Sequence, residues 1–144
     1  MSKLLGALEL SPSVTQLPLS WYFDPAVYDR EIEVFFKNGP GYVGHELMTP
    51  AANDYRALEV KDSAWALVNN GQGIEMVSNV CRHRQAVMLG GSGKLPGGNI
   101  VCPLHRWTYD GRGQLLGAPH FADQPCLHLP RKPLQRWNGM LFEG

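Results

Sequence analysis

The spacing of apolar residues along the chain changes character near residue 40. Ahead of that point the apolar positions recur at helical intervals, and they are Val27, Ile32, Phe35 and Phe36. Asp24 precedes Pro25 in the arrangement of a helix N-cap followed by a proline at the first helical position. Asn38-Gly39-Pro40 then interrupts the pattern. The segment therefore predicts a helix over about residues 25–37, and we expect its apolar stripe to pack against other protein.

After Gly41 the pattern changes to short apolar runs separated by turn residues, which is typical of β-strands. The candidate strands are residues 42–46, 55–60, 64–69, 74–80, 99–102, 107–110, 133–137 and 140–143. Asn70-Gly71 and Asp110-Gly111 mark tight turns, and Asn138-Gly139 joins the last two runs as a hairpin. We expect a mainly β fold, an antiparallel sandwich or barrel, with one short N-terminal helix.

The chain has 144 residues, which is enough for one domain with a modest core. Its 16 glycines and 11 prolines favour many short elements joined by turns rather than a helix bundle. We find no internal repeat. The change of pattern predicts an N-terminal extension over residues 1–40, which carries the helix, and a β domain over residues 41–144.

Charge and hydropathy narrow the classes of protein. The formal net charge is zero and no apolar run is long enough for a membrane helix, so we expect neither a nucleic-acid nor a membrane partner. Without a signal-peptide pattern we expect a cytoplasmic location, where three cysteines suggest metal ligation rather than disulfides. Residues 1–80 carry five Lys and Arg against ten Asp and Glu, a net of −5, whereas residues 81–112 carry five against one, a net of +4.

This basic segment contains two Cys/His pairs, Cys81-x-His83 and Cys102-x-x-His105. Each pair follows a predicted strand, and two loops at one end of a β scaffold can converge on a single site. Two thiolates and two imidazoles suit either a tetrahedral zinc or a Rieske [2Fe–2S] cluster. Zinc motifs usually pair like ligands, whereas here each loop supplies one Cys and one His. The mixed pairs favour the cluster, and a structural zinc domain is the alternative.

The motifs around these pairs resemble a known family. The stretches "CRHR", "CPLHRWTYD" and "LLGAPHF" are similar to the Rieske domain of the large (α) subunit of Rieske non-haem iron oxygenases, which are ring-hydroxylating mono- and dioxygenases. The resemblance extends over about residues 20–144, because the segment before the first strand and the closing "RWNGMLFEG" also match. It implies a Rieske-type β sandwich or barrel. It further implies that Cys81 and Cys102 bind the inner iron, that His83 and His105 bind the outer iron, and that Trp107 and Tyr109 pack beside the cluster.

Two residues depart from the family pattern. The family often reads C-x-H-R-G and C-P-x-H-G-W, and here Gln85 and Arg106 stand in place of the glycines. Glycine at such positions usually means a positive φ or a close backbone approach, so these loops have either ordinary φ values or tolerated strain. Arg82, Arg84 and Arg106 are cations close to the predicted cluster. They favour its reduced form, form a docking face for an acidic redox partner, or are solvated loop charges.

The resemblance also bears on the reduction potential. The high-potential respiratory type has an extra cysteine in each loop, but the corresponding positions here are Arg84/Gln85 and Leu104, so no disulfide links the loops. Trp107 stands where that type has a serine that donates a hydrogen bond to sulfur. Fewer hydrogen bonds to sulfur stabilise the reduced state less, so we predict a potential in the lower third of the Rieske range of roughly −150 to +300 mV.

The resemblance implies a one-electron relay as the function. A reductase or ferredoxin would reduce the cluster, and the electron would pass to a mononuclear iron in the catalytic domain of a neighbouring α subunit of a trimer. The His and carboxylate pattern of that iron site does not occur in this chain, so we expect the chain to carry electrons but to oxidise no substrate. A free-standing Rieske ferredoxin is an alternative. The N-terminal extension of this chain argues against it, because such ferredoxins usually begin almost directly at the first strand.

The remaining cysteine and histidines fall outside the ligand pattern. We predict that Cys126 is a free, partly buried thiol. Core or surface roles are expected for His45, His120 and His128.

Overall fold

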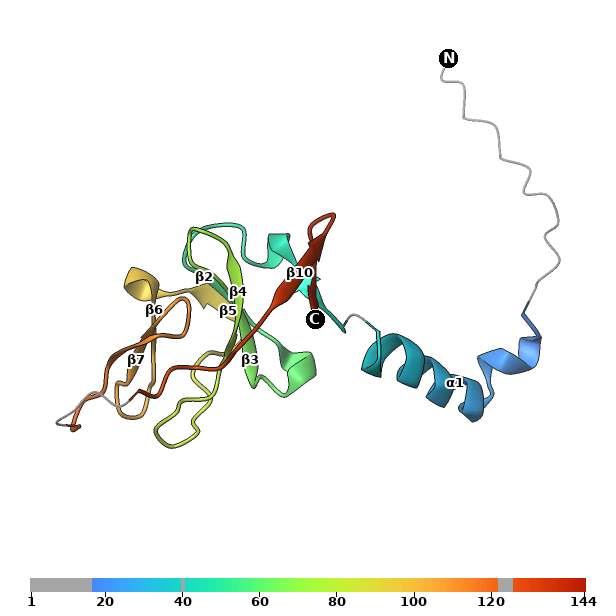
Figure 1. The fold of residues 1–144 in the computed structure, drawn as a ribbon, viewed down its shortest axis with the longest axis horizontal. Coiled ribbons are helices and arrows are strands. Elements are labelled where there is room, and N and C mark those ends of the chain that lie inside the picture. The colour runs from blue at the N-terminus through green and yellow to red at the C-terminus, as the bar shows by residue number, and fades with distance from the viewer. Residues whose placement is uncertain (1–16, 40, 122–125) are drawn as a thin grey trace, which may run out of the picture. The chain divides into compact units, whose positions relative to one another are not determined.

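The computed structural model describes residues 17–39, 41–121 and 126–144. Contacts divide the chain into two compact units, one ending at Gly39 and the other beginning at Pro40 (Figure 1). The first unit is helical and the second is built from β-strands. In the part of the chain that the structure describes, no helix is long and apolar enough to cross a membrane.

The helical unit consists of a short 3-10 helix, η1 (Leu19–Tyr22), followed by α1 (Pro25–Glu31), which continues as the π-helical turns of η2 (Ile32–Lys37). Asp24 is the N-cap, since its Oδ1 accepts a hydrogen bond of 2.9 Å from the backbone N of Ala26. The helical turns therefore extend from Pro25 to Lys37, with a widening of the backbone spiral at Ile32.

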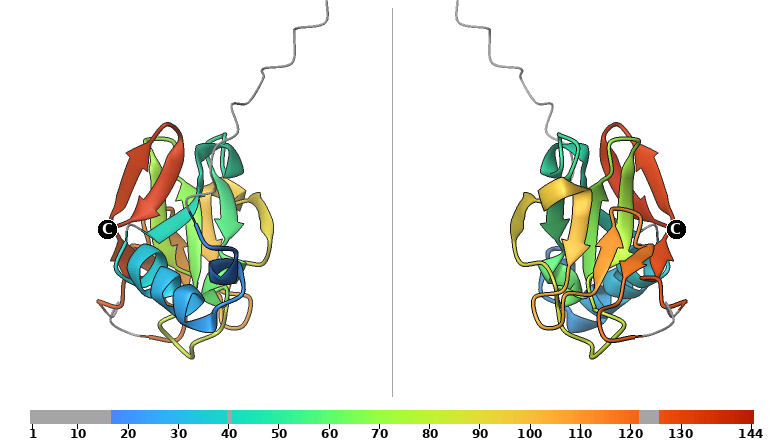
Figure 2. Two further views of the ribbon diagram at one scale, coloured as in Figure 1. Left: turned by 90° about the vertical axis from the view of Figure 1, so that its right-hand side faces the viewer. Right: turned by 90° about the vertical axis from the view of Figure 1, so that its left-hand side faces the viewer.

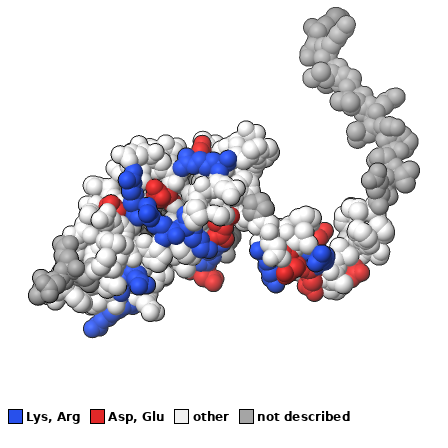
Figure 3. Space-filling view, viewed as in Figure 1, with Lys and Arg blue, Asp and Glu red and all other residues white. Residues whose placement is uncertain are grey.

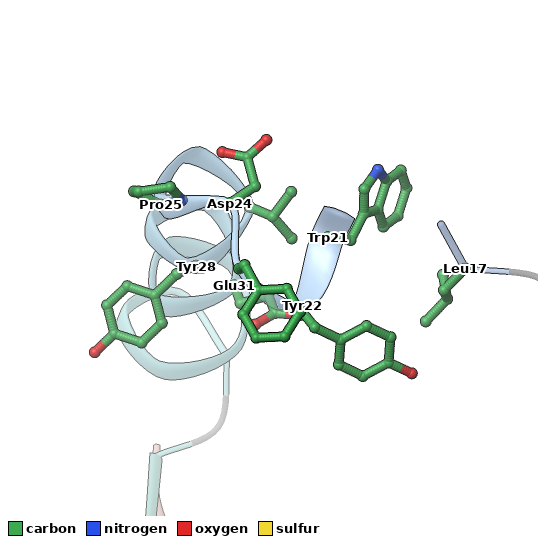
Figure 4. A pocket seen from close by; sticks show the side chains of 9 residues that line it. Leu17, Trp21, Tyr22, Asp24, Pro25, Tyr28 and Glu31 are labelled. Atoms are coloured by element: carbon green, nitrogen blue, oxygen red, sulfur yellow. The ribbon is translucent and has the colours of Figure 1, made fainter. Parts of the chain in front are cut away.

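The apolar side chains of this unit are largely exposed, and no residue of α1 or η2 is buried. Phe35 is 64% exposed and Phe36 is 70% exposed. The expected packing of the helical stripe is therefore not found among the described residues of the unit. A hollow of about 480 Å³ lies beside the start of the helix. Figure 4 shows Trp21, Tyr22 and Tyr28 among the side chains around it.

The β-rich unit contains three antiparallel sheets among its described residues, with strand orders β1-β11-β10, β5-β2-β3-β4-β9 and β6-β7-β8 (Figure 1). The strands are β1 (Gly41–His45), β2 (Asp54–Ala57), β3 (Trp65–Asn69), β4 (Ile74–Ser78), β5 (Ser92–Lys94), β6 (Asn99–Val101), β7 (Thr108–Asp110), β8 (Leu115–Gly117), β9 (Arg131–Lys132), β10 (Leu134–Trp137) and β11 (Met140–Glu143). The predicted mainly β, antiparallel fold is confirmed.

Every predicted run contains a strand, but two runs were too long. The run 74–80 ends as a strand at Ser78. The run 55–60 ends as a strand at Ala57, and the chain continues as the 3-10 helix η4 (Glu59–Lys61). Three strands were missed, namely β5, β8 and β9. All three residues of β5 are exposed, and β9 has only two residues at the edge of its sheet, so neither shows the apolar alternation that identifies a strand.

The turn residues are located where the sequence places them. Asn138 (φ 47°) and Gly139 (φ 79°) both have positive φ, which is the geometry of the tight hairpin turn that joins β10 to β11. At the β3–β4 turn, the side-chain Oδ1 of Asn70 accepts hydrogen bonds from the backbone N of Gln72 and Gly73. These turns fix the registers of the two hairpins.

Two clusters of buried residues form the core. One surrounds Leu67, Met76 and Leu141, which come from different strands of two sheets. The other contains both cysteines of the Cys/His pairs together with Trp107 and Tyr109. The two cysteines among the candidate ligands therefore belong to the core of the unit.

Glu143 in β11 connects distant parts of the β-rich unit. Its carboxylate accepts hydrogen bonds from Lys132 Nζ at 2.7 Å and from Lys61 Nζ. The bonds from Lys132 and Lys61 lower the pKa of Glu143 below its usual value, against the opposing effect of burial. The carboxylate thus joins the end of β11 to β9 and to the η4 turn.

We expect Glu143→Gln to lower the free energy of unfolding by about 1 kcal/mol near pH 7, because it removes both ion pairs. The folded-state pKa is depressed, so the carboxylate stabilises the fold above its unfolded-state pKa and loses this effect as the pH falls through the folded-state pKa. Urea unfolding of the wild type and the variant should therefore converge at acidic pH. Glu59→Gln, at an exposed position, is the control and should stay within about 0.5 kcal/mol of the wild type. A Glu143→Gln penalty that does not depend on pH would contradict this account.

Candidate metal centre

The two Cys/His loops share one backbone arrangement. In the first loop, Cys81 N donates to Ala86 O at 2.9 Å, and Gln85 N donates to Cys81 O at 2.9 Å. In the second loop, Cys102 N donates to the carbonyl oxygen five residues later at 2.8 Å, and Arg106 N donates back to Cys102 O at 3.1 Å. Both loops lie at the same end of the β-rich unit in all three ribbon views (Figures 1 and 2).

Both loops turn through a left-handed residue at the same position, four residues after the cysteine. Gln85 has φ 56° and Arg106 has φ 63°, a region that favours glycine. Of the two possibilities that the sequence left open, the loops keep the left-handed geometry and tolerate the strain. Such strain costs on the order of 1 kcal/mol or more at each residue, and it persists only where the surrounding contacts fix the backbone.

Asn79 fixes the start of the first loop, and sequence reasoning missed it. This side chain is 1% exposed. Its Nδ2 donates to Ser63 O at 2.8 Å and to Leu89 O at 2.7 Å, while its Oδ1 accepts from Leu89 N at 2.8 Å. A buried amide with all of these bonds satisfied holds the two ends of the loop together.

The structure groups the four predicted ligands in two pairs that Trp107 connects, because the cysteines share its buried cluster and His83 stacks on its ring. Cys81 and Cys102 are each 1% exposed. The rings of His83 and His105 are in contact, with centroids 4.6 Å apart and planes at 76°. Nδ1 of His83 is buried and has no hydrogen-bond partner among the described residues. A buried imidazole nitrogen without a partner, beside two buried thiols, is a donor set that fits a metal cluster.

Each loop thus carries one candidate sulfur ligand and one candidate nitrogen ligand. Among the described residues, no group of three or more His, Cys, Asp or Glu side chains is placed to hold a single ion. A Rieske cluster places only two protein side chains on each iron, so it does not require such a group.

His83 is packed more closely than His105 in the described part of the site. Trp107, which is fully buried, stacks on the His83 ring with centroids 5.0 Å apart and planes at 7°. Phe121 lies edge-on to His83 at 5.7 Å and to Trp107 at 5.0 Å. The sequence predicted Trp107 at this site but did not single out Phe121.

The protonation state of His83 follows from these surroundings. Burial lowers the pKa of His83, and the nearby His105, Arg84 and His120 lower it further. A lowered pKa favours the neutral imidazole, which is the form that binds a metal.

Tyr109 is positioned to donate a hydrogen bond to the first cysteine. Its Oη accepts a hydrogen bond from Arg82 N at 3.2 Å and lies 3.5 Å from Cys81 Sγ. Because Oη accepts from the backbone, the phenolic hydrogen is free to point at the sulfur. Burial raises the pKa of Tyr109 above its usual range, so this residue remains a protonated donor. The predicted contact of Tyr109 with the site is therefore a specific polar one.

We expect Tyr109→Phe to lower the reduction potential by roughly 40 mV. The variant loses one hydrogen bond of about 1 kcal/mol. A tenfold change in the equilibrium constant for reduction corresponds to about 59 mV, and about 1 kcal/mol is somewhat less than that. The sulfur carries more negative charge in the reduced state and gains more from the donor. A redox titration followed by absorbance measures the shift. Tyr55→Phe is the matched control, since that hydroxyl donates to Gly90 O and not to a candidate ligand. An unchanged potential in Tyr109→Phe would show that the hydroxyl does not donate to the sulfur.

Three arginines surround the site without forming ion pairs to the described residues. Arg82, Arg84 and Arg106 are all exposed. Figure 3 shows blue atoms without red beside them at the lower left of the β-rich unit, the end where the two loops lie in Figure 1. This end of the unit is therefore positively charged in its described part, as the sequence predicted for the segment.

The other cysteine and histidines lie outside the site or at its margin. Cys126 is exposed, so the prediction of a partly buried thiol is wrong; its Sγ lies 3.7 Å from His128 Nε2. His128 Nδ1 accepts from Leu115 N, and His45 Nδ1 accepts from the backbone N two residues later as the cap of a 3-10 turn. His120 is exposed and has a positive φ of 72°.

The chain was compared with known proteins. The profile of the Rieske [2Fe-2S] domain matches residues 41–130. The chain is 62% identical over 144 residues to the putrescine 2-hydroxylase of Ralstonia nicotianae, covering 100% of this chain and 39% of that protein. It is 52% identical over 146 residues to the putrescine 2-hydroxylase of Bordetella bronchiseptica, covering 92% of this chain and 34% of that protein. The crystal structure of naphthalene 1,2-dioxygenase from Rhodococcus sp. bound to indole is similar with a TM-score of 0.64 at 26% identity, covering 83% of this chain and 29% of that one.

This chain belongs to the Rieske [2Fe-2S] domain family, and its cofactor is the [2Fe-2S] cluster of that family. The matched profile is that of a [2Fe-2S] domain, so it supports the cluster and not the structural zinc alternative. The chain spans 39% and 34% of the lengths of the two curated relatives named above.

Proposed function

We propose that Cys81, His83, Cys102 and His105 hold the cluster and that the chain relays single electrons through it. The observation that carries the proposal is the convergence of two buried thiols and two touching imidazoles from two loops of the same backbone geometry. When bound, the cluster accepts and releases one electron at a time.

The residues around the cofactor site have three different roles. The two cysteines lie in the core, where burial keeps water away from the sulfurs. His83 and His105 are only half-buried and so reach from the core toward the surface. The three arginines at this end favour a negatively charged partner and a reduced, more negative cluster.

We propose further that the whole protein is a Rieske oxygenase. In this proposal residues 41–144 form the Rieske domain and residues 1–40 precede it as a helical extension. A reductase or ferredoxin supplies electrons, and the acceptor is a mononuclear iron in a catalytic domain beyond this chain, on a neighbouring subunit of a trimer. Three cysteines without a disulfide among them fit a reducing, cytoplasmic location.

The similarity to two putrescine 2-hydroxylases supports an aliphatic diamine as the substrate of the whole protein. The test is oxygen consumption by the full-length subunit with an electron donor, in the presence of putrescine, choline or naphthalene. We expect hydroxylated product only with the diamine. Turnover of choline or naphthalene alone would point to a different substrate class.

The electron-transfer role is tested on the 144-residue chain itself. We expect about two irons and two sulfides per chain and, after dithionite reduction, a rhombic low-temperature EPR signal with an average g below the free-electron value. Such a signal requires mixed Cys and His ligation. Iron and sulfide bound without this signal, even after reconstitution, would rule out the proposed ligand set. Substrate hydroxylation by this chain alone would contradict a pure electron carrier.

A further inference from the structure

The turn that follows β8 places the ring of Phe121 beside the candidate metal centre. Phe121 N donates to Ala118 O at 3.2 Å, which closes a four-residue turn. Pro119 occupies the second position, and His120, with φ 72°, occupies the third. A proline followed by a residue of positive φ is the pattern of a type II turn, whose third residue is normally glycine or asparagine.

The strained backbone at His120 is kept by contacts on both sides of the turn. A histidine in the left-handed region costs on the order of 1 kcal/mol, and such outliers persist where surrounding contacts determine them. Here the turn begins at Ala118, which is buried in the same core cluster as the two cysteines, and ends with the Phe121 ring against His83 and Trp107. The turn therefore links the core to the outer side of His83.

The ring of His83 is enclosed from three directions. Trp107 covers its face with planes at 7°, Phe121 meets it with planes at 88°, and His105 meets it at 76°. Phe121 is the outermost of the enclosing aromatic rings, at 46% exposure, whereas Trp107 is fully buried. Phe121 thus separates the contact between His83 and Trp107 from the solvent.

We propose that Phe121 is a positioning residue for His83, which it holds against Trp107 while excluding water from that side of the metal centre. The inference rests on the proposed role of His83 as a cluster ligand. A packed ring restricts rotation of the imidazole and lowers the local dielectric. Because reduction adds one negative charge, a drier site disfavours the reduced state. Phe121 therefore lowers the reduction potential and slows loss of iron.

Phe121→Ala should consequently admit water and favour reduction. We expect the equilibrium constant for reduction to rise about threefold to tenfold, which is roughly 30 to 60 mV at 59 mV per tenfold change. We also expect iron transfer to an external chelator to become about tenfold faster, as for other residues that support a metal ligand. Phe121→Tyr keeps the ring and should restore both values to those of the wild type.

Phe142→Ala is the matched control. Phe142 also packs edge-on against one aromatic ring, Tyr42, at 5.8 Å, but in the β1-β11-β10 sheet and not beside a candidate ligand. Its removal should lower stability without moving the potential. The readouts are a redox titration, the EPR signal of each variant and the rate of iron release.

The outcomes separate the two proposals. A wild-type chain without the Rieske EPR signal would overturn the proposed function and this inference together. A wild-type signal with the same potential and iron-release rate in Phe121→Ala would overturn this inference alone. Equal shifts in Phe121→Ala and Phe142→Ala would also overturn it, because they would reflect general loss of stability.

Discussion

Replacing Cys81 by serine is expected to remove the cluster almost completely. Cys81 Sγ is buried and faces Tyr109 Oη in the core. The sequence has two other thiols: Cys102, which is itself a proposed ligand, and Cys126, which is exposed and lies outside the two loops. A serine hydroxyl is a hard, weakly acidic ligand that binds iron–sulfur iron far less well than a thiolate does. We expect iron and sulfide contents to fall at least about tenfold, with loss of visible colour and of the EPR signal.

Cys126→Ser is the matched control for that variant. Cys126 is a free, exposed thiol near His128, outside the two loops. The same sulfur-to-oxygen change at this position should leave iron, sulfide and EPR intensity at wild-type levels. Loss of the cluster in Cys126→Ser, or its retention in Cys81→Ser, would mean that the ligand set is assigned to the wrong cysteines. The two variants together therefore test which thiols bind iron, independently of any activity of the longer protein.

The sequence predicts the fold well where a local signal is strong. The β10–β11 hairpin follows from Asn138-Gly139, because few residue pairs adopt positive φ at both positions. At the β3–β4 turn Gly71 has positive φ, and the Asn70 side chain accepts hydrogen bonds from the turn backbone. Short apolar runs identify β3 and β4, whose residues are buried almost continuously along each strand. The edge strand β9 could not be predicted, since two residues paired to β4 carry no periodic pattern and the strand depends on its partner.

The candidate ligands can be predicted from the sequence because their residue types, cysteine and histidine, themselves indicate metal binding. Thiols and imidazoles in mixed pairs indicate the cluster before any geometry is known. The supporting residues are different. Asn79 and Phe121 are common residue types whose roles depend on contacts with segments that are distant in sequence, such as Ser63 and His83. The left-handed φ of Gln85 stayed open at the sequence level, because glutamine itself gives no sign of it and only the family's glycine at this position suggested it.

Trp107→Ala is expected to have the largest effect on stability among single substitutions near the site. The indole is fully buried and packs on His83 and Phe121, so its loss leaves a large cavity in the core cluster that contains both cysteines. Truncation of a buried tryptophan costs about 3 to 5 kcal/mol. Its Nε1 has no hydrogen-bond partner among the described residues, so the penalty arises from packing and not from a lost hydrogen bond.

Urea unfolding of Trp107→Ala and Trp137→Ala compares two identical truncations that differ in burial. Trp137 is 64% exposed, and its removal should change the free energy of unfolding by less than about 0.5 kcal/mol. Trp107→Phe keeps an aromatic face toward His83 and should recover most of the stability and the cluster content that Trp107→Ala loses. If Trp107→Ala stays within about 1 kcal/mol of the wild type while losing the cluster, the indole supports the ligand histidine more than the core. If Trp107→Ala loses about 3 to 5 kcal/mol and Trp107→Phe retains the cluster, the aromatic ring at this position stabilises both the core and the metal centre.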